Sequence, residues 1–143
     1  MGYMCHHAII VTCWDRDRIK QAHAEATRLL GQVDTDATYG TESYNLVSSL
    51  VGEVMNGFWS FLVAPDGSKE GWPTSANGDT AREAFLAWLR SQDYADGGSP
   101  FDYAVVQFGD DDGDQRVMWA SRVVKGPGGN LVAGDPRDAV SQP

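Results

Sequence analysis

The sequence predicts an α+β domain built on the ferredoxin-like βαββαβ plan, with an extra C-terminal strand and both helices on one face of the sheet. Three observations predict this class. A short apolar, β-branched run opens the chain at residues 6–14. Two stretches with helical periodicity follow, and the remaining apolar runs come in pairs joined by turn-forming residues. The resulting order is strand, helix, strand pair, helix, strand pair.

Composition and length predict one domain. The chain has 143 residues, of which 42% are hydrophobic, including five Trp, five Tyr and five Phe. This suits a single compact core, which we expect within residues 1–125. Residues 126–143 are rich in Gly, Pro and polar residues and are expected to form a flexible tail.

The first strand and helix have the clearest signals. Residues 6–14 are short and almost uniformly apolar, as expected for a central strand buried on both faces. Asp15 or Asp17 can then cap a helix that ends at Gly31. Its apolar residues fall on one face: Ile19, Ala22, Ala26, Leu29 and Leu30.

Residues 32–43 are polar and are expected to form a loop, whereas residues 44–55 fit both a helical stripe and a strand. We prefer the strand. The dipeptide Asn56-Gly57 readily adopts the positive φ angles of a two-residue hairpin turn, and the aromatic run 58–63 follows it directly.

The second half of the chain begins with a turn at Pro65-Asp66-Gly67 and a loop that extends to Trp72. A helix is expected to open near residues 77–80, because Thr80 and Glu83 have the residue types of a capping box. Its buried stripe is expected to contain Ala81, Ala84, Phe85, Trp88 and Leu89. Residues 101–108 and 117–124 then predict a second hairpin around the turn 109–114.

Several of these segments resemble a known family. They are the string APDGSKEGW at 64–72, the residues Gly78-Asp79, Arg82, Phe85 and Leu89, the strand from Phe101-Asp102 to Gly109-Asp110-Asp111, and the opening run His6 to Thr12. Together they are similar to small uncharacterised proteins of tailed bacteriophages and prophages, over most of residues 5–114. The resemblance implies a phage-encoded accessory protein in the host cytoplasm, acting on a host protein or a defence system. It implies no catalytic residues.

The loop 66–72 is the best candidate site, because surface loops usually carry function. Ser68 and Lys69 could donate to an anion, and Trp72 offers a flat face to a ligand or a partner. Arg82 on the following helix is the fourth residue that folding does not obviously require. These four residues predict a contact with a host protein or a small anionic ligand.

Two alternative functions stay open at this point. One is a small enzyme acting on a nucleotide or phosphate ester, which would depend on His7, Cys13 or a metal. The other is an acidic mimic of DNA, since the formal net charge is -9. The same charge opposes direct binding to nucleic acid or to anionic membranes. We favour the binding protein over the enzyme, because no Ser, His and acid set has recognisable spacing.

No metal and no cofactor is expected. Cys5-His6-His7 carries metal-binding side chains, but adjacent strand residues point to opposite faces. The acidic run 110–114 lacks the later Glu of a calcium loop and is expected to be a solvated turn. The two cysteines are too few for a disulfide framework, and no signal peptide or membrane span is visible, so we expect a cytoplasmic protein. A homodimer is plausible, because such a sheet exposes one face.

Overall fold

The computed structural model describes residues 5–34, 43–68, 71–109 and 116–120. They form an α+β domain, as the sequence predicts. The elements in chain order are β1 (His6–Cys13), α1 (Arg16–Leu30), β2 (Val33–Asp34), β3 (Ser43–Tyr44), η1 (Met55–Gly57), β4 (Trp59–Val63), α2 (Pro73–Ser91), β5 (Asp102–Phe108) and β6 (Arg116–Ala120).

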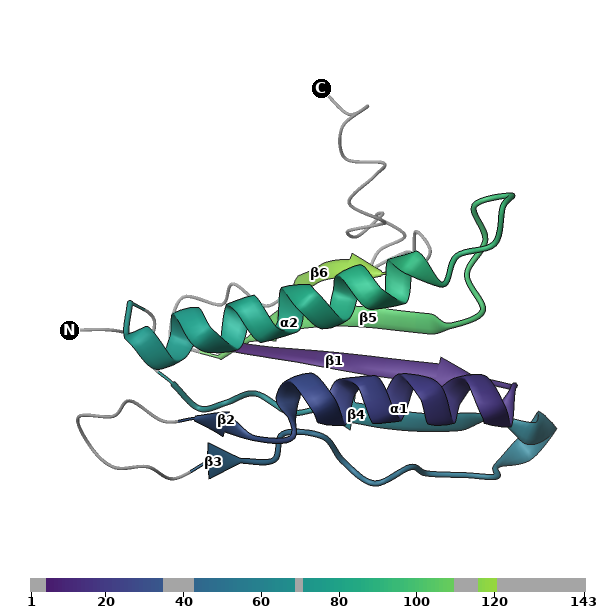
Figure 1. Ribbon diagram of the computed structural model, residues 1–143, viewed down its shortest axis with the longest axis horizontal. Coiled ribbons are helices and arrows are strands. Elements are labelled where there is room, and N and C mark those ends of the chain that lie inside the picture. Colours follow the sequence, from purple (N-terminus) through teal and green to yellow (C-terminus); the bar gives the residue numbers. More distant parts are fainter. Residues whose placement is uncertain (1–4, 35–42, 69–70, 110–115, 121–143) are drawn as a thin grey trace.

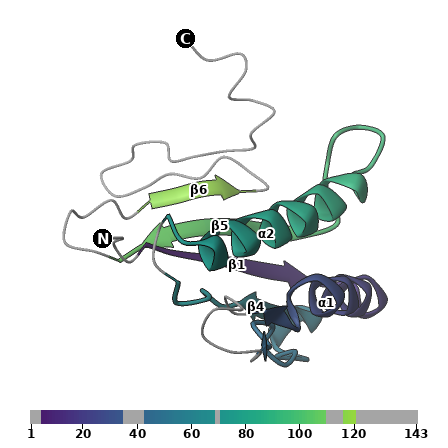
Figure 2. The same ribbon diagram turned by 60° about the vertical axis from the view of Figure 1, so that its left-hand side comes forward.

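The main sheet has the strand order β4-β1-β5-β6, and every pairing in it is antiparallel. The prediction that the first strand is central is therefore confirmed, but the expectation that it is buried on both faces is wrong, because Ile10 of β1 is 45% exposed. Figure 1 shows α1 and α2 side by side on the same face of this sheet, and the turned view in Figure 2 shows β6 at the far edge from β4. Strands β2 and β3 form a separate two-stranded ribbon, so the loop expected over residues 32–43 is wrong at Val33–Asp34 and at Ser43, which pair as strands.

The core lies between this sheet and the two helices. Alternation along β1 directs Ile9, Val11 and Cys13 toward the helices, where all three are buried. The helices supply most of the remaining large side chains, namely Ile19, Leu30, Phe85, Leu86 and Leu89. The other sheet strands add Phe61, Val63, Tyr103 and Val105.

The prediction for α1 is confirmed almost residue for residue. Asp15 is the N-cap, and its Oδ1 accepts hydrogen bonds from the backbone N–H groups of Asp17 (3.0 Å) and Arg18 (3.3 Å). Gly31 is the C-cap, and its N–H donates to the Thr27 carbonyl at 2.8 Å. The start of this helix is thus closed by its own side-chain cap.

Residues 44–55 depart from the expected strand. Tyr44 belongs to β3, and beyond it only Val47 and Val51 make isolated antiparallel bridges, to Val63 and Ser60 of β4. The second strand of the ferredoxin-like plan is therefore reduced to two bridges, and the full plan is not shown. Asn56 and Gly57 do adopt the expected positive φ angles, 62° and 75°. The connection is longer than the expected two-residue turn, because the three residues Met55–Gly57 separate Val54 from Phe58, whose N–H and carbonyl bond at 3.0 Å.

The predicted start of α2 is wrong. The helix begins at Pro73, with Trp72 as an N-cap that makes no side-chain cap bond. Pro at the first helical position needs no N–H partner, and its fixed φ suits the helix, so it starts α2 one turn early. The capping box does not form: Thr80 Oγ1 donates instead to the Ala76 carbonyl at 3.0 Å. Ala84, expected in the buried stripe, is exposed.

The second hairpin is confirmed where it is described, because β6 pairs antiparallel with β5. The expected turn residues 110–114, the strand residues 123–124 and the proposed tail 126–143 lie outside the described residues. Within the described chain, neither helix combines the length and apolarity needed to cross a bilayer.

Candidate functional site

The loop between β4 and α2 is organised by Asp66. Its Oδ1 accepts hydrogen bonds from the Ser68 N–H at 2.9 Å and from the Ser68 hydroxyl at 2.6 Å. Such a local turn fixes the backbone direction after Pro65-Asp66-Gly67, as the turn residues predict. In this structure, therefore, both donors of Ser68 are bonded to Asp66.

The second oxygen of Asp66 faces α2. Arg82 Nη1 lies 3.5 Å from Asp66 Oδ2, and Arg82 Nη2 forms an ion pair with Asp79 Oδ1. The Arg82 side chain is only 7% exposed and that of Asp66 11%, whereas that of Asp79 is 53% exposed. One buried cation is thus shared between a buried and an exposed carboxylate, and we call these three residues the Asp66 cluster.

Gly78 allows the loop to approach the helix this closely. A Cβ at residue 78 would lie 2.1 Å from Asp66 Oδ2 and 3.2 Å from Arg82 Nη1. Both distances are shorter than ordinary contacts, so a side chain here would displace the Asp66 carboxylate. The backbone at residue 78 is regular helix, and glycine is required here for space rather than for its φ angle.

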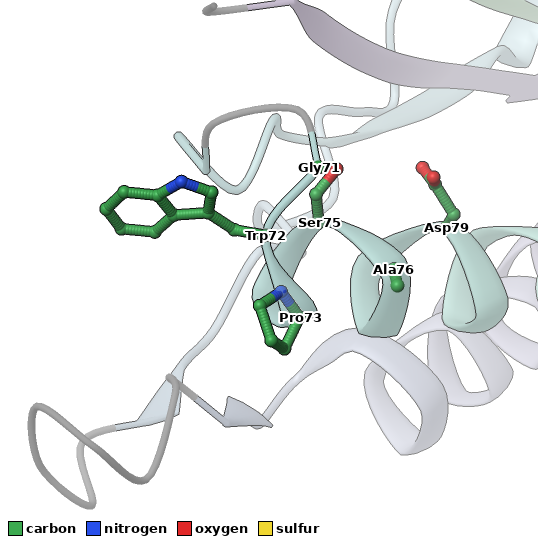
Figure 3. A pocket seen from close by; sticks show the side chains of 6 residues that line it. All are labelled: Gly71, Trp72, Pro73, Ser75, Ala76 and Asp79. Atoms are coloured by element: carbon green, nitrogen blue, oxygen red, sulfur yellow. The ribbon is translucent and has the colours of Figure 1, made fainter. Parts of the chain in front are cut away.

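A hollow of about 400 Å³ lies beside this cluster, at the start of α2. Its lining comes from the last loop residues and the first two helical turns: Gly71, Trp72, Pro73, Ser75, Ala76 and Asp79. In Figure 3, Ser75 and Asp79 point to the same side of the helix, while the Trp72 indole projects away from the helix. Trp72 is 41% exposed.

The charge at the hollow is negative. The Asp66 cluster holds two carboxylates and one guanidinium, and its exposed member is Asp79. The excess carboxylate charge therefore reaches solvent at the hollow that Trp72 also lines. An aromatic face and a carboxylate both attract cations, so this arrangement suits a basic group better than an anion.

Only one of the predicted site residues that the structure describes lines the hollow. Trp72 lines the hollow, Arg82 belongs to the Asp66 cluster, Ser68 is hydrogen-bonded to Asp66, and Lys69 lies outside the described residues. Sequence reasoning missed Asp79 as a site residue. Its spacing of three from Arg82 is a helical ion-pair signal that is visible in the sequence. The approach of Asp66, sixteen residues before Arg82, has no such local signal.

Cys13 has the environment of a core residue. Its Sγ donates to the Pro100 carbonyl at 3.2 Å and accepts from the Asp15 N–H at 3.4 Å. Burial raises the pKa of the Cys13 thiol, and the nearby Asp15 backbone hydrogen bond opposes that rise only in part. A raised pKa leaves less thiolate and so works against a nucleophilic role. Cys5, the other cysteine, is not in a disulfide either.

The described residues contain no group of three His, Cys, Asp or Glu side chains placed to hold a metal ion. The acidic run 110–114 lies outside them. No family model, no curated protein and no solved structure matches this chain. The resemblance to phage proteins therefore stays a prediction, and function has to be argued from the site.

Proposed function

We propose that this chain is a binding protein that receives a basic side chain of a partner protein in the hollow at the start of α2. Trp72 supplies an aromatic face and Asp79 a carboxylate for that side chain. The observation that carries the proposal is that the exposed Trp72 side chain and the exposed Asp79 carboxylate line one hollow, where Asp79 shares the Arg82 cation with Asp66.

The expected magnitudes favour a protein over a small ligand. A cation over an exposed indole contributes about 0.5–1 kcal/mol, and an exposed ion pair about 0.2–1 kcal/mol. Together they amount to roughly 1–2 kcal/mol, far less than the roughly 8 kcal/mol of a micromolar complex. The remaining free energy has to come from a wider contact surface, which a partner protein offers. The net charge of -9 favours basic partners in the same way.

This proposal revises the anionic ligand expected from the sequence. Two of its expected donors, Ser68 and Arg82, are bonded to carboxylates. A host protein remains the partner class that the phage resemblance implies, as a target of inhibition or as part of a defence system. An acidic mimic of DNA, the alternative function, would also bind a basic partner protein through its negative charge.

The test uses an array of peptides that differ in Lys and Arg content, probed with the full chain. We expect basic peptides to bind, and Trp72→Ala and Asp79→Asn each to weaken that binding about five- to tenfold, the loss of about 1 kcal/mol. Met55→Ala is the matched control, because Met55 is 84% exposed and does not line the hollow. Preference for acidic peptides, or equal binding by all variants, would contradict the proposal.

A ferredoxin-like plan is our proposal for the topology. It is supported by the position of β1 between β4 and β5, with both pairings antiparallel, and by the bridges of Val47 and Val51 at the outer side of β4. Measured exchange of the Ser48 and Val51 amides tests it. Their N–H groups donate to Leu62 and Ser60 of β4, so slow exchange is expected of an edge strand. Exchange as fast as in an unpaired loop would contradict it.

A further inference from the structure

We propose that the open face of the main sheet is an interface between two copies of this chain. Both helices cover the opposite face, and no described element lies over this one (Figures 1 and 2). Its centre is formed by the neighbouring side chains of Ile10 on β1 and Leu62 on β4, which are 45% and 37% exposed. This face is separate from the Trp72 hollow, and the inference does not depend on the proposed function.

The face is apolar well beyond its centre. Strand alternation places Ala104, Val106 and Phe108 on β5 on the same side as Ile10, together with Ala8 on β1, which is only 4% exposed and adds little to the open surface. Phe108 is 39% exposed, and Val51, which bridges to Ser60, is 61% exposed on the same side. Contiguous apolar surface of this kind on a sheet usually marks an interaction site.

Charge is nearly absent from the part of this face that β1, β4 and β5 form. Among the residues of β1, β4 and β5 that point to it, Asp102 and His6 are the ionisable ones, at opposite ends of the register. Beside Asp102, the Thr12 and Ser60 hydroxyls lie 2.8 Å apart and bond to each other. The chain as a whole carries 20 acidic and 11 basic residues. A nearly neutral face on such an acidic chain lets two copies meet without direct repulsion at the contact.

The pattern of large and small side chains is self-complementary. Ile10 pairs with Leu62 on one side and with Ala104 on the other. A two-fold axis running along β1 would set the Leu62 of one copy over the Ala104 of the other, and the reverse. Isologous dimers require this matching of a surface with itself.

The available area predicts a weak dimer. Four strands about 4.8 Å apart, with about six residues each at a rise of about 3.3 Å, give a face of roughly 20 Å by 20 Å. Two such faces bury roughly 800–1,000 Å² in total, at the lower end for specific interfaces. We therefore expect dissociation in the micromolar range, so that monomer and dimer interconvert with concentration.

Sedimentation velocity of the full chain over roughly 1–500 μM tests the proposal, a range that brackets micromolar dissociation. We expect the dimer fraction to rise with concentration in the unaltered chain. Leu62→Glu should leave only monomer, because it places two like charges in an apolar contact. Met55→Glu, at an exposed apolar residue on the hairpin turn, should dimerise as the unaltered chain does.

Thermal melting of each variant separates loss of association from loss of folding. If Leu62→Glu unfolds, Ile10→Cys replaces it: under oxidising conditions the thiols introduced at residue 10 of each copy, near the two-fold axis, should form a disulfide that dilution does not reverse. A chain that is monomeric at every concentration would overturn the proposal. So would a dimer that survives Leu62→Glu but is lost in Met55→Glu.

Discussion

The two helices begin in opposite ways. The first turn of α1 is closed by Asp15, whose carboxylate accepts from two backbone N–H groups. The first turn of α2 has Trp72 at the cap position, no side-chain cap bond and Pro73 as its first residue. Its order depends instead on the Asp66 cluster, which joins the preceding loop to the second and third turns. The difference lies in what the cap residue does: Asp15 bonds the first turn of α1, whereas the cap position of α2 carries an exposed indole that makes no side-chain cap bond.

Among the variants considered, Arg82→Ala should lower the free energy of unfolding the most, because it removes the cation that joins the loop to α2. It leaves the buried Asp66 carboxylate without its cation, and removing one partner of a buried pair costs roughly 3–5 kcal/mol. Because Asp79 is half exposed, we expect about 2–4 kcal/mol from urea unfolding. The control is Arg28→Ala in α1, where the ion pair with Glu25 has the same spacing but an exposed Arg. Equal losses in both variants would mean that the Asp66 cluster does not hold α2.

Gly78→Ala should have the next largest effect. The added methyl would lie 2.1 Å from Asp66 Oδ2 and force the carboxylate away. Overfilling costs about 1–3 kcal/mol, while alanine gains about 1 kcal/mol in helix propensity, so we expect a net loss of about 1 kcal/mol. Asn77→Ala, at an exposed neighbour, should instead stabilise by about 0.5 kcal/mol. A stabilising Gly78→Ala would show that the close approach is not needed.

Trp72→Ser and Trp72→Ala test whether the N-cap position of α2 lacks a side-chain cap bond. Both remove the indole and should lose the same binding. Serine can supply the missing cap hydroxyl, so Trp72→Ser should be more stable than Trp72→Ala by about 1 kcal/mol in thermal unfolding. Asp15→Ala should lose about the same amount at α1, where the cap exists. If serine and alanine are equally stable at residue 72, the start of α2 is not an open cap.

The smallest effect concerns pH at the start of α1, where the Asp15 N–H donates to Cys13 Sγ. Burial raises the pKa of the folded thiol, so the unfolded chain loses its proton first as pH rises. The contribution of the protonated Cys13 thiol to the free energy of unfolding is complete below the ordinary pKa of a thiol. It is lost as pH rises toward the higher pKa of the folded chain. Denaturant unfolding from pH 7 to pH 10 should therefore show a fall in stability that is smaller in Cys13→Ala. An identical pH dependence in both chains would contradict this.

Local signals predicted the parts of the fold that depend on local interactions. The β-branched run of β1, the cap at Asp15 and the positive φ angles at Asn56-Gly57 each have their cause within a few residues. The start of α2 was missed because Thr80 and Glu83 imitate a capping box, while Pro73 and a distant Asp66 determine the actual start. Residues 44–55 are ambiguous in the sequence because Tyr44, Val47, Val51, Val54 and Met55 also fit a helical stripe. Of these five residues the structure buries only Val47, so their spacing does not mark a buried face.

The candidate site was predicted only in part for the same reason. Trp72 could be chosen because nothing local requires it. Ser68 and Arg82 looked equally available, since their carboxylate partners are brought to them by folding. A basic side chain in a sequence cannot be counted as free to bind a ligand until the acids around it in space are known. The excess charge of the Asp66 cluster, on which the proposed preference for a cation rests, arises only when the chain folds.

The contact between Gly78 and Asp66 also bears on how this region opens. The first two turns of α2 contain Pro, Thr, Ser, Asn and Gly, which favour helix weakly, so they depend on the loop that touches them. We expect amides at 76–80 to exchange with solvent together with that of Ser68, as one cooperative unit that opens at lower free energy than the middle of α1. A partner seated on Trp72 would slow exchange throughout this unit. Occupancy of the hollow could thus be followed by amide exchange before the partner is identified.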